Sequence, residues 1–139
     1  MSPLERVADR PTWLLSRASA RAQTLLADAF AAEGVRGYDF RVLAALDQYG
    51  PSSQADLGRH TGIDRSDIVA TVGALVSAGY ARRAPDPTDG RRNVVTITRR
   101  GATKLLRLDT ALDGVQQRLL APLSATERRA LLRALRKLA

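Results

Sequence analysis

The sequence contains no cysteine, a single histidine and few aromatic residues. Without cysteine it can form no disulfide, no thiolate zinc site and no cysteine-based redox sensor. The one histidine, His60, stands alone on a short predicted helix, so we expect it to contact solvent or a phosphate and we expect no metal site. P-loop, Rossmann, nucleophile-elbow and zinc-hydrolase motifs do not occur either. We therefore expect neither an enzyme nor a protein that carries a cofactor.

Long apolar runs are also missing. No stretch approaches the roughly 20 apolar residues of a membrane span. The N-terminal segment MSPLERVADRP is charged where a signal peptide needs an apolar run. These features predict a cytoplasmic protein with no membrane partner.

The charge that is present is strongly positive. The chain has 139 residues, 22 of them Lys or Arg against 14 Asp or Glu, which gives a formal net charge of +8. Its length and its 45% of hydrophobic residues fit one domain with a real core. The basic balance favours a polyanionic partner, nucleic acid before membrane.

A basic hairpin is predicted near the middle of the chain. Two short runs, Tyr80 to Ala84 and Asn93 to Thr98, flank a polar segment rich in proline, aspartate and glycine, which is typical of two strands joined by a long turn. The hairpin and its edges carry six arginines: Arg82, Arg83, Arg91, Arg92, Arg99 and Arg100. Such an element suits insertion into the minor groove of DNA, although a solvated surface hairpin would show the same pattern.

Two helices are predicted at the N-terminal end. The first is long, from Thr12 to Glu33, with Pro11 in a position typical of a first helical turn and Gly34 able to cap the end. The second runs through YDFRVLAALDQY and stops at Gly50-Pro51.

Two further helices are predicted to form a helix-turn-helix. Ser53 opens a short third helix, with Asp56 as its capping partner and Gly62 at its end. Asp64 is the expected N-cap of the fourth helix, whose apolar stripe ends before Gly79. The basic hairpin follows at once, and this order predicts a winged helix-turn-helix with the fourth helix as the groove reader.

Leucine-striped helices are also predicted after the hairpin. One runs from about Arg99 to Ala121 and is broken by Pro122, and the last begins at Ser124 with a capping box to Glu127. Their apolar faces, and that of the first helix, must be buried somewhere. We expect them to pack against their copies in a two-fold homodimer; the alternative is that they fold back into a larger monomer.

These motifs resemble the MarR (multiple antibiotic resistance regulator) family of transcription factors. The segment PSSQADLGRHTGIDRSDIVATVGALVSAGYARR resembles the helix-turn-helix of that family. The segment DPTDGRRNVVTIT resembles its wing, an Asp-x-Arg at the tip followed by an aliphatic strand ending in threonine. The resemblance implies a mainly α fold with a small β-hairpin in a single domain, residues 1–139. It implies dimerisation helices at 1–36 and 101–139 and a DNA-binding lobe at 37–100.

The resemblance assigns roles to the wing. Arg91 matches the wing-tip arginine that enters the minor groove, and Asp89 matches the aspartate that holds it by a charge-assisted hydrogen bond. Arg82, Arg83 and Arg92 are expected to contact phosphates, which positions the protein without encoding sequence.

The resemblance also assigns roles to the fourth helix. The residues that match positions touching bases or phosphates are Arg65, Ser66, Asp67, Val69 and Ala70. Two of them depart from the family pattern, because Ala70 stands where relatives often have arginine and Asp67 where they often have threonine. Asp67 either accepts from a cytosine amino group or is a helix-start charge, and we favour the second reading. Direct readout would then rest on Arg65, Ser66 and a methyl contact to thymine, with much of the specificity coming from DNA shape.

Members of the family often bind small aromatic or amphipathic effectors between the dimerisation helices and the DNA-binding lobe. Trp13, Tyr38 and Tyr49 are expected near such a crevice, since these side chains offer an apolar face with a polar handle. The alternative is ordinary core or interface packing, and we favour it over a ligand role.

The sequence thus predicts a ligand-responsive repressor that binds double-stranded DNA at a pseudo-palindromic operator as a homodimer. Two other classes stay open. One is a nonspecific or architectural nucleic-acid-binding protein driven by its charge. The other is an interaction module that kept the fold and lost DNA reading, against which the wing arginines argue.

Overall fold

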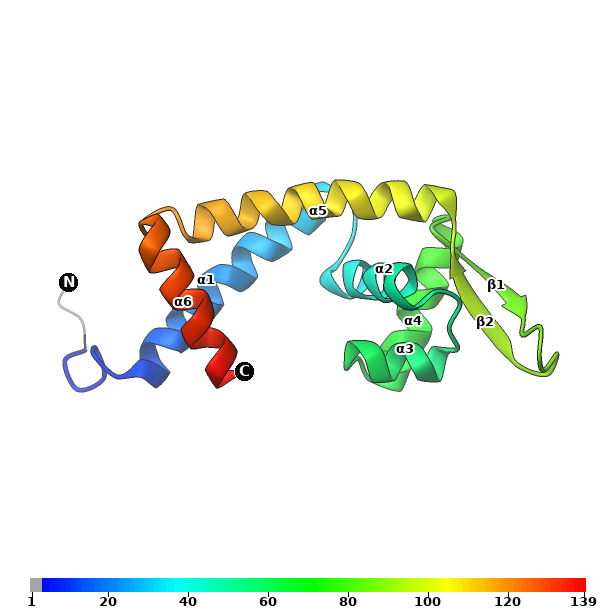
Figure 1. The fold of residues 1–139 in the computed structure, drawn as a ribbon, viewed down its shortest axis with the longest axis horizontal. Coiled ribbons are helices and arrows are strands. Elements are labelled where there is room, and N and C mark those ends of the chain that lie inside the picture. The colour runs from blue at the N-terminus through cyan, green and yellow to red at the C-terminus, as the bar shows by residue number, and fades with distance from the viewer. Residues whose placement is uncertain (1–3) are drawn as a thin grey trace. The chain divides into compact units, whose positions relative to one another are not determined.

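The computed structural model describes residues 4–139 as two compact units. The first unit runs up to Ala29 and takes in Ala111–Ala139, and the second is Phe30–Thr110. The elements are α1 (Pro11–Ala32), α2 (Gly37–Tyr49), α3 (Gln54–Thr61), α4 (Arg65–Ser77), β1 (Ala81–Pro85), β2 (Asn93–Ile97), α5 (Arg99–Leu119) and α6 (Ala125–Leu138). This mainly helical order with one antiparallel hairpin confirms the predicted fold class (Figure 1).

The core of the second unit lies where α2, α3 and α4 meet. Each of these helices turns an apolar stripe inward, and burying it removes hydrocarbon from water, the main favourable term in folding. Phe30, at the end of α1, stacks on Phe40 with ring centroids 5.5 Å apart. The most deeply buried side chains of these three helices are Val42, Leu43, Leu46, Leu57, Ile68, Val72 and Leu75.

The hairpin is joined to this core by one extra backbone pair. Strands β1 and β2 pair from Ala81 opposite Ile97 to Pro85 opposite Asn93. Ser52 then exchanges two backbone hydrogen bonds with Val95, at 3.0 and 2.8 Å. The base of the hairpin is therefore held, while its tip extends beyond α2, α3 and α4 (Figure 1).

A tight joint connects α4, the hairpin and α5. The Thr98 hydroxyl donates to the carbonyl of Gly79 at 2.6 Å and accepts from the backbone amide of Gly101 at 3.0 Å. A Cβ atom on Gly101 would lie 2.0 Å from the carbonyl oxygen of Tyr80 and 2.9 Å from a side-chain carbon of Ile97. Because backbone atoms cannot yield as side chains do, only glycine fits at position 101.

The first unit buries much less of its apolar surface. Among its described residues, Val115 is the one large hydrophobic side chain that is fully buried. An apolar groove of about 410 Å³ lies between α1, the end of α5 and α6. The large hydrophobic residues that stay exposed in α1 and α6 are Trp13, Leu14, Leu15, Leu131, Leu132, Leu135 and Leu138. Such a surface is typical of an interface with another chain.

The predicted caps are confirmed at three helix ends and differ at one. Ser53 and Asp56 form the expected capping box on α3, and Ser124 and Glu127 form the one on α6. Gly62 ends α3 in the left-handed region at φ 70°. Asp64 does occupy the N-cap of α4, but its side chain makes no capping hydrogen bond there.

None of the helices in the described part of the chain is long and apolar enough to cross a bilayer.

The joint at Gly101 yields a stability prediction. Gly101→Ala should lower the free energy of unfolding by more than about 2 kcal/mol, because α5 must move away from Tyr80 to admit the methyl group. Gly73→Ala is the matched control, since no atom lies within 4 Å of the added carbon and the helix gains up to about 1 kcal/mol. Urea unfolding of both variants measures the difference, and equal effects would contradict the tight joint.

The two N-caps yield a second prediction. Ser53→Ala should cost about 1 kcal/mol, because Ser53 accepts from the amide of Asp56 at 3.1 Å. Asp64→Ala should cost less than about 0.5 kcal/mol, because only its interaction with the helix dipole is lost. Urea denaturation compares them, and similar losses would mean that Asp64 also caps its helix.

Candidate nucleic-acid interface

The turn between α3 and α4 is fixed by local hydrogen bonds. Thr61, which is buried, donates its hydroxyl to the Leu57 carbonyl at 2.6 Å and accepts from the amide of Ile63 at 3.3 Å. Gly62 supplies the left-handed residue between the helices. These contacts fix the angle between α3 and α4, as a helix-turn-helix requires.

Helix α4 has one buried and one exposed face. Ile68, Val72 and Leu75 lie in the core. The predicted reading residues on the opposite side are exposed: Arg65, Ser66, Val69 and Ala70. The side chains assigned to the DNA groove are therefore brought together on one accessible surface.

Asp67 lies apart from this exposed group. It is half-buried in the first turn of α4, where a carboxylate interacts favourably with the positive end of the helix dipole. This position fits the reading of Asp67 as a helix-start charge, which remains a prediction.

The two aspartates of the wing tip bind backbone groups. The Asp86 carboxylate accepts from the amide and the hydroxyl of Thr88, both at 2.8 Å. The Asp89 carboxylate accepts from the backbone amide of Arg91 at 3.1 Å. The contact that holds residue 91 therefore runs to its main chain, which leaves the guanidinium group to project from the tip.

Hydrogen bonding also sets the ionisation of Asp86. The amide of Thr88 and then its hydroxyl hold the pKa of the Asp86 carboxyl below its usual range. The carboxylate form is thus the one that organises the turn, and the turn presents the arginines beside it.

The wing arginines are exposed and form no direct ion pair within the described residues. Arg82, Arg83, Arg91 and Arg92 all lie in the accessible part of the hairpin. The ion pairs within residues 4–139 join Arg59 to Asp56 and both Lys104 and Arg107 to Glu33, so none of them involves the wing. Such charges suit contact with phosphates.

A cleft of about 870 Å³ joins three elements of the predicted interface. It is lined by Arg59 of α3, Arg65 and Val69 of α4, and Arg92 at the edge of β2, among others. Hydrogen bonding to Ser53 keeps the pKa of the Asp56 carboxyl below its usual range, and the guanidinium groups of Arg59 and Arg92 act in the same direction. The cleft therefore brings the predicted reading helix together with Arg59 of α3, Arg65 of α4 and Arg92 of the turn before β2.

Two residues of this cleft were missed by the sequence analysis. Gln54 and Arg59 of α3 line it together with the predicted residues. The side-chain oxygen of Gln54 is buried and has no hydrogen-bond partner within the described chain. The sequence offered only a weak signal for Gln54, a polar residue directly after the N-cap Ser53. That α3 lies beside the start of β2 is a result of the tertiary fold, which the sequence pattern does not reveal.

The aromatic residues assigned to an effector crevice lie in different parts of the structure. Trp13 belongs to the first unit, whereas Tyr38 and Tyr49 are exposed at the two ends of α2 in the second. The guanidinium of Arg41 lies 5.5 Å from the Tyr38 ring centroid. His60 is exposed, as expected, but its ring also stacks on Tyr49 at 3.7 Å between centroids. Their role toward an effector remains a prediction.

Comparison with known proteins gives these features a family. Residues 34–92 match the model of the MarR family, a span that includes the helix-turn-helix and the wing tip. The chain is 35% identical over 99 residues to the HTH-type transcriptional repressor NicR of Pseudomonas putida. That match covers 71% of this chain and 63% of the length of NicR.

Solved structures match over nearly the full length. The fold is similar to that of a probable transcriptional regulator from Pseudomonas aeruginosa, with a TM-score of 0.82, 31% identity and coverage of 96% of this chain and 99% of that one. It is also similar to the MarR family protein Rv2887 of Mycobacterium tuberculosis in complex with DNA, with a TM-score of 0.79, 26% identity and coverage of 100% and 99%. The family model, the repressor and the two full-length folds agree with the wing and the helix-turn-helix described above, and this chain is a member of the MarR family.

Proposed function

We propose that this protein is a transcriptional repressor that binds a pseudo-palindromic DNA operator as a homodimer in the cytoplasm and is released by a small effector. The observation that carries the proposal is the exposed face of α4 beside a paired hairpin that carries four exposed arginines. The repressor NicR and the DNA complex of Rv2887 support it by similarity. No catalytic role is proposed.

Base reading would rest on few side chains. Arg65 is the one long basic residue among the exposed reading positions, and a bidentate contact to guanine is its commonest specific contact. Ser66 can bond to several bases, while Val69 and Ala70 suit the thymine methyl group. Since few side chains can contact bases in the major groove, Arg91 of each wing would add specificity by responding to the width of the minor groove.

The homodimer follows from the first unit. Its exposed leucines would be costly in water and would be covered by the same helices of a second chain. Two copies would present two reading helices to half-sites about one helical turn apart. An effector would act only if it binds with different affinity to dimers that can and cannot span both half-sites.

A nonspecific DNA-binding protein is the second candidate, favoured by the net charge of +8. The salt dependence of DNA binding distinguishes this candidate from the specific repressor. Fluorescence anisotropy should show the DNA upstream of its own gene bound at least ~10³-fold more tightly than a scrambled duplex at physiological salt. Equal binding that vanishes with salt would support the nonspecific alternative.

Arg91 tests the wing. Arg91→Ala should weaken operator binding by about 1–3 kcal/mol if the side chain enters the minor groove, and the turn should survive because Asp89 holds the main chain. Arg133→Ala, on exposed α6, is the control that removes one positive charge elsewhere. An operator affinity that falls equally in both variants would reduce Arg91 to bulk charge.

The apolar face of α6 tests the dimer. Leu132→Glu should shift the protein toward a monomer in analytical ultracentrifugation, because it places a charge among the exposed leucines. Arg129→Glu introduces the same side chain on the polar side of the same helix and should leave the dimer intact. A dimer that persists in Leu132→Glu would move the interface away from this face.

A further inference from the structure

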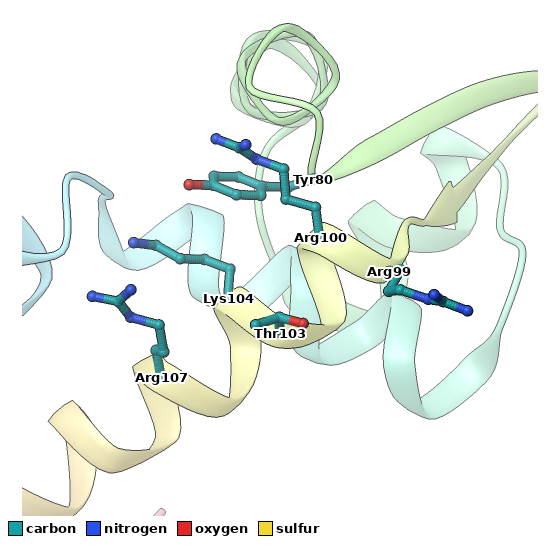
Figure 2. A pocket seen from close by; sticks show the side chains of 6 residues that line it. All are labelled: Tyr80, Arg99, Arg100, Thr103, Lys104 and Arg107. Carbon is teal, nitrogen blue, oxygen red and sulfur yellow. The ribbon is translucent and has the colours of Figure 1, made fainter.

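A row of three cations runs along one face of α5. Arg100, Lys104 and Arg107 are spaced i, i+4 and i+7, so they lie on the same side of the helix and span about 10 Å along its axis. Figure 2 shows their side chains and the Tyr80 hydroxyl pointing to one side, whereas Arg99 points away. With Thr103, these residues line an open pocket of about 700 Å³.

The row is held in place by contacts within the same unit. The Arg100 guanidinium lies 5.2 Å from the Tyr80 ring centroid, and the Lys104 ammonium lies 6.0 Å from it. Lys104 also donates to the carbonyl of Glu33 at 2.6 Å. Tyr80 itself is fixed by the close approach of Gly101. Two of the three cations are therefore positioned before any ligand arrives, which lowers the cost of binding.

The charge of the row is only partly compensated. The Glu33 carboxylate lies 3.1 Å from Lys104 and 3.3 Å from Arg107. The hydrogen bond from Lys104 holds the pKa of the Glu33 carboxyl below its usual range, so this group is ionised at neutral pH. One carboxylate pairs with two of the three cations, Arg100 forms no ion pair within residues 4–139, and like charges at i, i+4 destabilise a helix.

The position of the row at the start of α5 adds to this imbalance. The first turn of α5 contains Arg99 and Arg100 and no acidic residue, although the positive end of the helix dipole disfavours cations there. The helix dipole therefore disfavours this charge, and a bound anion would offset it.

The pocket lies away from the residues assigned to the DNA grooves. Tyr80 follows the end of α4, and the 13 residues of that helix separate it from Arg65 by about 20 Å. The wing tip is also remote, since five paired residues of β1 extend about 17 Å from Ala81. The pocket lies at the base of the hairpin, so a ligand that diffuses freely is the better occupant.

We propose that Arg100, Lys104 and Arg107 bind a small polyphosphate, such as the phosphate chain of a nucleotide. A single carboxylate is too short to engage a row of about 10 Å, whereas linked phosphoryl groups offer acceptors along it. The forked guanidinium groups of Arg100 and Arg107 match phosphate oxygens, and Lys104 supplies a point charge between them. Thr103 also lines the pocket.

Isothermal titration calorimetry of the full chain with sodium tripolyphosphate tests the proposal without DNA. We expect saturable binding of one tripolyphosphate per chain. Arg100→Gln and Arg107→Gln, both at exposed positions, should each weaken it by about tenfold or more. Glu33→Gln should strengthen binding several-fold, because it removes the carboxylate that competes for Lys104 and Arg107. Arg133→Gln, an equal loss of charge on α6, should leave the affinity unchanged.

Four results would overturn the proposal. The first is the absence of saturable tripolyphosphate binding, and the second is an equal loss of affinity in Arg100→Gln and Arg133→Gln. The third is equal affinity for citrate, which would show that the pocket does not select phosphoryl groups. The fourth concerns DNA phosphates, which share the chemistry of the probe. If Arg100→Gln and Arg107→Gln weaken duplex binding and leave tripolyphosphate binding unchanged, the row serves the DNA backbone instead.

Discussion

Helix α4, the hairpin and α5 all depend on the close approach of Gly101 to the carbonyl of Tyr80. Helix α4 ends just before Tyr80, β1 begins just after it, and β2 leads through Thr98 into α5. The hydroxyl of Thr98 ties the two connections together. Because α5 lies too close for any side chain at position 101, a shift of one element must move the others. The reading face and the wing base are thus held as one rigid part, which lowers the ordering cost of binding a long, stiff ligand.

The electrostatics of the wing follow from how its aspartates are used. From the sequence alone one would expect Asp86 and Asp89 to form ion pairs with the neighbouring arginines. Both carboxylates instead accept from groups of the turn, those of Thr88 and the amide of Arg91. The acidic residues therefore shape the tip while they offset part of its positive charge, as the effect of Arg92 on the pKa of the Asp86 carboxyl indicates. The arginines of the hairpin still outnumber its aspartates. Cations in excess of this kind attract a polyanion, which releases counterions when it binds them.

The parts that were predictable from sequence are those with local causes. The capping box at Ser53 and the left-handed turn at Gly62 each depend on residues within one helical turn, so their patterns could be recognised directly. The absent cap at Asp64 depends on a side-chain rotamer that no pattern encodes. The cleft brings Arg59 and Arg92 together across 33 positions of sequence, which only tertiary packing achieves. A lone glycine within a helix pattern likewise indicates only a weaker helix, and the need for glycine appears once its neighbour is known.

Tyr80 links the basic row of α5 to the reading helix. Its backbone forms the joint with Gly101, and its ring carries the guanidinium of Arg100. An anion bound by Arg100 and Lys104 would therefore contact side chains that pack on the residue between α4 and β1. Such an anion can influence DNA binding only if its affinity differs between the free and the DNA-bound protein. Linkage then requires that DNA change the affinity for the anion by the same factor.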